Sequence, residues 1–175
     1  MNPTEYQIAA HRFATYPHSD AMEYLALGLA EEVGEVCGKL KRLKRGEQVL
    51  DSAIILELGD VCWYVSEICR HMGFDWGRIV AIEDAKTGGC RPLPIWVLYM
   101  DEAAATISAA MVTASVSEKP VYIGAMSSGI QETTGAIIGF CDAMGVTIDQ
   151  VLDANIEKLQ GRMAAGTICG SGDSR

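Results

Sequence analysis

The stretch from Leu25 to Tyr64 constrains this chain most, because it carries two pairs of carboxylates at helical spacing. Glu32 and Glu35 form one pair, and Glu57 and Asp60 form the other. Residues three apart on a helix lie on one face, about 5–6 Å from each other. Two such helices packed together would bring four carboxylates to one point. That is a set of hard oxygen ligands suited to Mg²⁺ or Mn²⁺.

The surroundings of the second pair distinguish this hypothesis from a simpler one, a charged helix face in water. The pair lies within IILELGDVCWYV, which is too apolar for a solvent-exposed face. Buried carboxylates need partners, and one metal ion serves all four. Lys39 and Arg42 continue the face of the first pair, and Tyr64 continues that of the second. The spacing therefore favours a metal site between two helices.

Composition limits the class of protein. The chain has 175 residues and 49% of them are hydrophobic, which is enough for one domain with a sizeable core. Its net charge of −9 argues against non-specific binding to nucleic acid, which needs basic patches. Six cysteines without a C-x-x-C pair favour reduced core thiols. The start of the sequence is unlike a signal peptide, and no apolar run approaches the roughly 20 residues of a membrane span. We therefore expect a cytoplasmic protein with no membrane or nucleic-acid partner.

Apolar residues recur at helical spacing along most of the chain, and Gly or Pro separates the periodic segments. We expect helices over about residues 4–16, 21–45, 53–72, 76–86, 95–116, 130–144 and 147–164. The segment 117–129 is ambiguous, because its VYIGAM also suits a short extended piece. One strand alone has nothing to pair with. The pattern therefore predicts a single all-α domain, a helical bundle over residues 1–175.

A weak internal repeat relates the two halves of the chain. Cys69–Gly73 falls on Cys141–Gly145, and Lys86 falls on Lys158, 72 residues later. Chance similarity between amphipathic helices is the alternative explanation. The repeat predicts a bundle of two unequal halves with internal pseudo-symmetry. We place an intact half at about residues 4–90, a degenerate half at about 95–165 and a tail at 166–175.

Asn155, Lys158 and Arg162 share one face of the last expected helix. An amide, an ammonium and a guanidinium in one row suit a phosphate or the edge of a nucleobase. A polar surface on a terminal helix explains the spacing equally simply. Other kinds of site find no support. The histidines lack the spacing of a di-iron bundle or of H-E-x-x-H, and GSGDSR follows no strand and opens no helix.

EEVGEV followed by ELGDVCWY resembles the MazG-like all-α nucleoside triphosphate pyrophosphohydrolases, whose pattern is E-x-x-E, a spacer and E-x-x-D. The resemblance covers about residues 4–84 and 130–175. It departs in the middle, where about 70 residues resemble a degraded second copy. This arrangement is similar to the two-repeat dimeric all-α dUTPases. Glu83 of the first half stands where Asn155 stands in the second, so the two halves are expected to complete one site together.

The resemblance implies Mg²⁺-dependent hydrolysis of a nucleoside triphosphate to the monophosphate and pyrophosphate by a homodimer, with Mn²⁺ as a substitute. One of the carboxylates, Glu35 or Glu32, would act as the base. The implied metal ligands are Glu32, Glu35, Glu57 and Asp60. The implied substrate contacts are Lys39, Lys158 and Arg162 to phosphate, and Tyr64 and Asn155 to sugar or base.

Two alternatives remain open from the sequence. One is a dUTPase-like enzyme with a narrow base preference. The other is a non-catalytic nucleotide-binding or scaffold protein, which the eroded second copy keeps in consideration. The four intact carboxylates argue against such a loss of catalysis.

Overall fold

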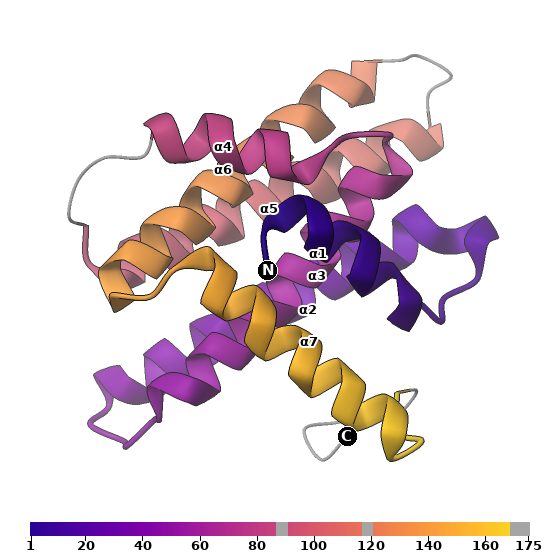
Figure 1. Ribbon diagram of the computed structural model, residues 1–175. Coiled ribbons are helices and arrows are strands. Elements are labelled where there is room, and N and C mark those ends of the chain that lie inside the picture. Colours follow the sequence, from indigo (N-terminus) through magenta and orange to yellow (C-terminus); the bar gives the residue numbers. More distant parts are fainter. Residues whose placement is uncertain (87–90, 117–120, 169–175) are drawn as a thin grey trace.

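The computed structural model describes residues 1–86, 91–116 and 121–168, and within these ranges it contains helices and no strand. The expectation of an all-α fold is therefore confirmed (Figure 1). Two short 3-10 turns, His11–Phe13 and His18–Asp20, lie between the first two helices. The helices are α1 (Pro3–Ala10), α2 (Ala21–Lys44), α3 (Asp51–His71), α4 (Trp76–Lys86), α5 (Leu93–Val116), α6 (Val121–Met144) and α7 (Ile148–Ala164).

Two long helix pairs form the centre of the bundle. The first pair is α2 with α3, the second is α5 with α6, and α2 also packs along α5. The middle of α3 is buried on almost every side, because α1, α2, α6 and α7 all contact it. One continuous core joins both pairs, with Leu29, Leu58, Ile107 and Ile130 fully buried.

The third helix of each half packs mainly on the pair of the other half. α4 follows α3 along the chain but lies mostly along α6, and α7 follows α6 but lies mostly across α3 (Figure 1). This exchange agrees with the expected pseudo-symmetry, in which α2, α3 and α4 correspond to α5, α6 and α7. It also places a helix of the second half beside the carboxylates of the first.

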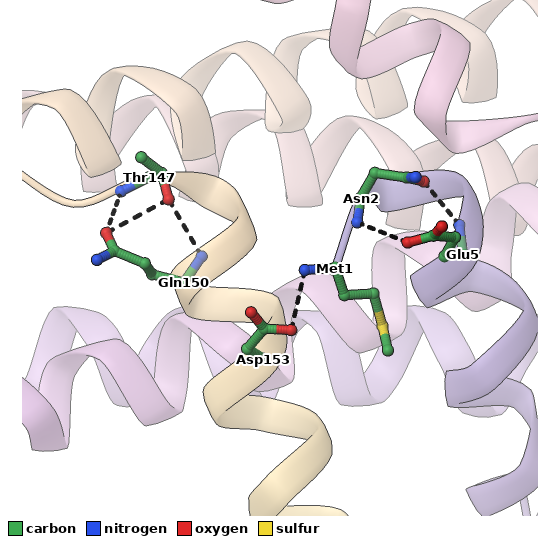
Figure 2. A network of polar contacts seen from close by, with 6 residues as sticks. All are labelled: Met1, Asn2, Glu5, Thr147, Gln150 and Asp153. Carbon is green, nitrogen blue, oxygen red and sulfur yellow. Dashed lines mark hydrogen bonds and ion pairs between the residues drawn. The ribbon is translucent and has the colours of Figure 1, made fainter.

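Capping boxes define the starts of α1 and α7 (Figure 2). In each box, two residues three apart exchange side-chain and backbone hydrogen bonds. The pairs are Asn2 with Glu5 and Thr147 with Gln150. Between the two boxes, the Met1 ammonium group lies 3.0 Å from Asp153 Oδ1. These contacts join α1 to α7, the helix that carries Asn155 and Lys158.

Both helices of the second pair begin earlier than the sequence predicted. α5 starts at Leu93, and α6 starts at Val121 rather than near residue 130. The first turns of α6 contain Gly124 and Gly129, whose low helix propensity hides the period. Packing against α5 overrides that weak local preference. Residues 117–120 of the ambiguous segment lie outside the described residues.

The expectation that no apolar run reaches the length of a membrane span is wrong for α5. Over Leu93–Ala114 this helix is long and apolar enough to cross a membrane, and the bent α6–α7 pair passes the same test as one broken span. Such helices are weak evidence, because core helices of soluble proteins share their length and composition. α5 packs against α2 and α6, and 39% of its most apolar window is buried inside the protein.

Candidate functional site

Three of the four predicted carboxylates meet between α2 and α3. Glu32 and Glu35 from α2 and Glu57 from α3 each offer one oxygen, and the three oxygens lie within 4.8 Å of one another. All three side chains are half-buried. Among the described residues no second group of this kind occurs. Spacing along each helix explains the cluster, because both pairs lie on the faces that meet when the two helices pack.

Asp60, the fourth predicted ligand, lies one turn after Glu57 and is buried beside this cluster. Its Oδ1 accepts a hydrogen bond from Asn155 Nδ2 at 2.7 Å, and its Oδ2 binds the Lys158 ammonium group. Both partners come from α7, so the exchanged helix reaches the site. Asp60 is thus held in place by protein donors, whereas the other three carboxylates face one another.

The crowding of negative charge shows in the protonation of Glu32. Burial, together with the nearby charges of Asp60 and Glu35, raises the pKa of Glu32 to about 8, while Lys158 opposes them. Without a cation, the cluster therefore keeps a proton near neutral pH. A divalent cation would favour the charged form of Glu32 and so oppose this shift, and the donor set therefore fits a hard metal ion.

Two ammonium groups bind the carboxylates across helix boundaries. Lys39 Nζ lies 2.9 Å from Glu57 Oε1, and Lys158 Nζ, bound to Asp60, lies 3.8 Å from Glu57 Oε2. These pairs are largely shielded from water, which strengthens their attraction. Their positive charges lie beside the carboxylates, where a metal ion or a substrate phosphate chain would also bind. Both predicted phosphate-binding lysines therefore lie at the cluster.

Asn155 is fully buried, and both of its polar ends are used inside the protein. Its Nδ2 donates to Asp60, and its Oδ1 accepts from Tyr6 OH at 2.7 Å. α7 comes this close because residue 59 is glycine: a Cβ there would lie 2.8 Å from Asn155 Cβ. The structure thus gives Asn155 the role of orienting Asp60. Its expected contact with sugar or base stays a prediction.

An aromatic pocket adjoins the carboxylates, and it contains the other two predicted substrate contacts, Tyr64 and Arg162. Tyr64 and Trp63 meet edge to face with ring centroids 4.9 Å apart, and Tyr24 lies 6.3 Å from Tyr64. The cavity is only about 70 Å³, so a nucleobase would require the exposed Tyr24 ring to shift. Its lining is Phe13, Thr15, Tyr24, Glu32, Asp60, Trp63, Tyr64, Leu159, Arg162 and Ile168.

The sequence reasoning missed Tyr24 and Trp63, although both carry a signal. Tyr24 lies two helical turns before Glu32, and Trp63 lies three residues after Asp60, so each shares a face with a carboxylate. Gly28, between Tyr24 and Glu32, is a third sequence feature that indicates this pocket. A Cβ at this glycine would lie 2.1 Å from the Tyr64 ring, so the ring occupies the space that a side chain would need.

A basic hollow continues from the other side of Glu35 along the end of α2. It is lined by Glu35, Gly38, Lys39, Lys41, Arg42 and Arg45, and it has a volume of about 280 Å³. Arg42 and Arg45 both bind Glu47, at 2.9 and 2.6 Å. The cluster therefore lies between an aromatic pocket and a basic hollow, as a ligand with an aromatic end and an anionic end would require.

Comparison with known proteins identifies the family of this chain. The family model of the MazG nucleotide pyrophosphohydrolase domain matches residues 21–86. That span holds α2, α3 and α4 with all four carboxylates, and it ends before α7. The gene 37 protein of Mycobacterium phage L5 is 33% identical over 83 residues, which cover 41% of this chain and 73% of that protein. No solved structure matches the chain significantly. The resemblance seen in the sequence is thus confirmed, and the chain belongs to the MazG nucleotide pyrophosphohydrolase family.

Proposed function

We propose that the protein hydrolyses nucleoside triphosphates, ribo or deoxy, to the monophosphate and pyrophosphate, with Mg²⁺ as the resident metal and Mn²⁺ as a substitute. The observation that carries this proposal is the meeting of three carboxylate oxygens within 4.8 Å, next to two lysines and an aromatic pocket. Family membership supports the same reaction class.

The chain's donors suit the metal. Glu32, Glu35, Glu57 and Asp60 would hold Mg²⁺, since carboxylate oxygens are its preferred ligands and four carboxylates meet there against two lysine ammonium groups. When bound, such an ion neutralises phosphate oxygens and makes water a better nucleophile.

The protein's own groups would do the rest. Glu35 or Glu32 would take the proton from the attacking water as general base. Lys39 and Lys158 would move from their carboxylate partners to the phosphate chain, and Arg162 would bind phosphate from the aromatic pocket. Tyr64 would contact the sugar or base there, while Asn155 keeps Asp60 oriented. Lys41, Arg42 and Arg45 offer a place for the departing pyrophosphate.

The test is a product assay with a matched pair of variants. The protein is incubated with Mg²⁺ and a panel of NTPs and dNTPs, and pyrophosphate, phosphate and monophosphate are measured. Glu57→Ala removes a cluster carboxylate and should abolish turnover with little loss of fold. Glu31→Ala removes an exposed glutamate next to Glu32 and should leave turnover near wild type.

The pattern of products decides between the alternatives. Pyrophosphate from several substrates supports the proposal. Pyrophosphate from dUTP alone identifies the dUTPase-like enzyme. No product from any nucleotide with Mg²⁺ or Mn²⁺ identifies a non-catalytic binding protein, and unchanged activity in Glu57→Ala rules out the carboxylate cluster as the site.

We further propose a homodimer that acts on the cytoplasmic nucleotide pool. The support for the homodimer is a pair of exposed apolar side chains near the start of α5, Ile95 and Leu98, which a second copy would cover. Sedimentation at the monomer mass at micromolar concentration would contradict this assembly.

A further inference from the structure

A second pocket lies between α4, α5 and α6, away from the carboxylate cluster. Its volume is about 520 Å³, which is within the range of small-molecule sites, about 300–1,000 Å³. Charged and aromatic side chains share its wall. They are Glu83, Lys86, Arg91, Trp96, Tyr99, Glu102 and Glu132, with Gly135 and Ala136 at the α6 side.

This pocket is the counterpart of the carboxylate site in the second half. α4 lies along α6 as α7 lies across α3, so the two pockets form at corresponding helix junctions. With the shift of 72 residues, three of its wall residues correspond to three residues of the first site. Glu132 corresponds to Asp60, Lys86 to Lys158 and Glu83 to Asn155.

The second pocket differs from the first in its carboxylates, because no three of its described side chains bring their ligand atoms together as Glu32, Glu35 and Glu57 do. Glu57 corresponds to Gly129, where a Cβ would lie 2.7 Å from Ile107 Cγ1 and 3.2 Å from the Ala103 carbonyl oxygen. α5 and α6 are therefore too close at this point to admit a carboxylate side chain. We expect a ligand here to be held by the remaining side chains, without a metal ion.

Aromatic and cationic groups cover one side of the pocket. The Arg91 guanidinium lies 5.7 Å from the Trp96 ring centroid and 5.5 Å from that of Tyr99, and its Nη1 donates to Tyr99 OH at 3.3 Å. Trp96 adds a buried Nε1–H that has no hydrogen-bond partner within the described part of the chain. A guanidinium placed over aromatic rings is a surface on which nucleobases stack, and its N–H groups suit base carbonyls or a phosphate.

Carboxylates line the rest of the pocket. Glu83 is buried and paired with Lys86 at 2.7 Å, while Glu132 accepts a hydrogen bond from Ser128 Oγ at 2.7 Å. Glu102 is exposed at the rim. Such acceptors suit ribose hydroxyls and base amino groups. Three carboxylates against two cations also disfavour a triphosphate chain that brings no metal with it.

We propose that this pocket binds a nucleoside unit, as the free nucleoside or its monophosphate, without a metal ion. The proposal goes beyond the hydrolysis proposed above and does not depend on it. The aromatic wall and Arg91 hold the base, and the carboxylates bind hydroxyl and amino groups. Lys86 and Arg91 donate hydrogen bonds to the phosphate where one is present. The chain then carries two sites for nucleotide-like ligands, one with the carboxylate cluster for a metal ion and one without it.

The experiment is equilibrium binding in the presence of EDTA, by calorimetry on the full chain. The probes are adenosine, guanosine, cytidine, uridine and their 5′-monophosphates. At least one probe should bind with one site per chain. Arg91→Ala and Glu132→Gln should each weaken binding at least about tenfold, which corresponds to the loss of one charge-assisted hydrogen bond or more. Glu57→Ala should leave this binding unchanged.

Circular dichroism and thermal melting of each variant establish that it is folded. Arg91 and Glu132 are exposed, so both variants should fold as the wild type does. Equal binding of a nucleoside and its monophosphate would support the site with its phosphate outside the pocket. Preference for the monophosphate would support contact with Lys86 and Arg91. Absence of binding by all eight probes at millimolar concentration overturns the proposal. So does binding that survives both pocket variants, or that is lost in Glu57→Ala.

Discussion

The two helix pairs share one topology but differ in what lies between their helices. Between α2 and α3 the contact holds carboxylates, and the ion pair of Lys39 with Glu57 crosses it. Between α5 and α6 the contact holds small residues, with Gly129 against Ala103 and Ile107. The second pair therefore packs more closely. The contact between α2 and α3 thus includes charged side chains, whereas glycine lets α6 approach α5 closely at residue 129.

The third helices show a second difference. α7 brings Asn155 and Lys158 to bind Asp60, whereas Lys86 of α4 pairs with Glu83 on its own helix. The first pocket is thus tied together across helices, and the second is left open. The first junction is therefore closed by polar contacts between α3 and α7, whereas the pair at the second junction lies within α4.

The largest expected effect is on activity, from Asp60→Asn. This change keeps the shape of the side chain but removes its charge and its ion pair with Lys158. We expect the kcat/KM for nucleoside triphosphates with Mg²⁺ to fall by about a hundredfold or more, as for loss of a group that stabilises transition-state charge. Steady-state pyrophosphate release measures it.

The matched control is Asp101→Asn. It removes an exposed carboxylate from α5, in the second helix pair, and should keep activity within about twofold. If Asp60→Asn were as active as this control, Asp60 would be a structural partner of α7 only. The site would then consist of the three clustered glutamates.

The next effect is on stability, from two glycines of α6. Gly129→Ala places a Cβ 2.7 Å from Ile107 Cγ1, so it should lower the free energy of unfolding by about 1–3 kcal/mol through overpacking. Gly124→Ala meets no atom within 4 Å and should raise it by up to about 1 kcal/mol, because alanine favours the helix. Urea unfolding followed by circular dichroism compares them. Equal effects would mean that α5 and α6 are not closely packed.

Much of the fold followed from the sequence because helical periodicity is a local property. The two carboxylate pairs and the last helix lie where their spacing placed them. The start of α6 did not follow, because glycines that permit close packing with α5 also weaken the local helix signal. Local preference and tertiary packing act in opposite directions at this point, and packing decides.

The site was predictable to the extent that it depends on which residues share a face within each helix. Spacing brought Glu32, Glu35 and Glu57 together, but it could not say that α7 would turn the Asn155 side chain inward toward Asp60 and Tyr6. That depends on how α7 rotates where it crosses α3. The aromatic pocket was missed for a similar reason, because its walls come from several elements.

The last expected effect concerns the proton held by Glu32, whose pKa is about 8 in the folded protein against an ordinary value of 4.5. Between these values the folded state binds more protons than the unfolded state, so this group's contribution to stability is full below about pH 4.5 and is lost as pH rises through 8. Mg²⁺ needs the carboxylate and must displace the proton. Its apparent affinity should therefore rise about tenfold per pH unit up to pH 8 and then level off.

Titration of the wild type with Mg²⁺ at pH 6, 7, 8 and 9, followed by the shift in melting temperature, measures this dependence. Glu31→Gln should keep the slope, because Glu31 is exposed, whereas Glu32→Gln should flatten it, because the titrating group is gone. A wild-type affinity that does not change between pH 6 and 8 would show that Glu32 is already ionised in the metal-free protein. The carboxylates between α2 and α3 would then be balanced by Lys39 and Lys158 alone. The contrast between this helix pair and the pair of α5 and α6 would lie in packing and not in charge.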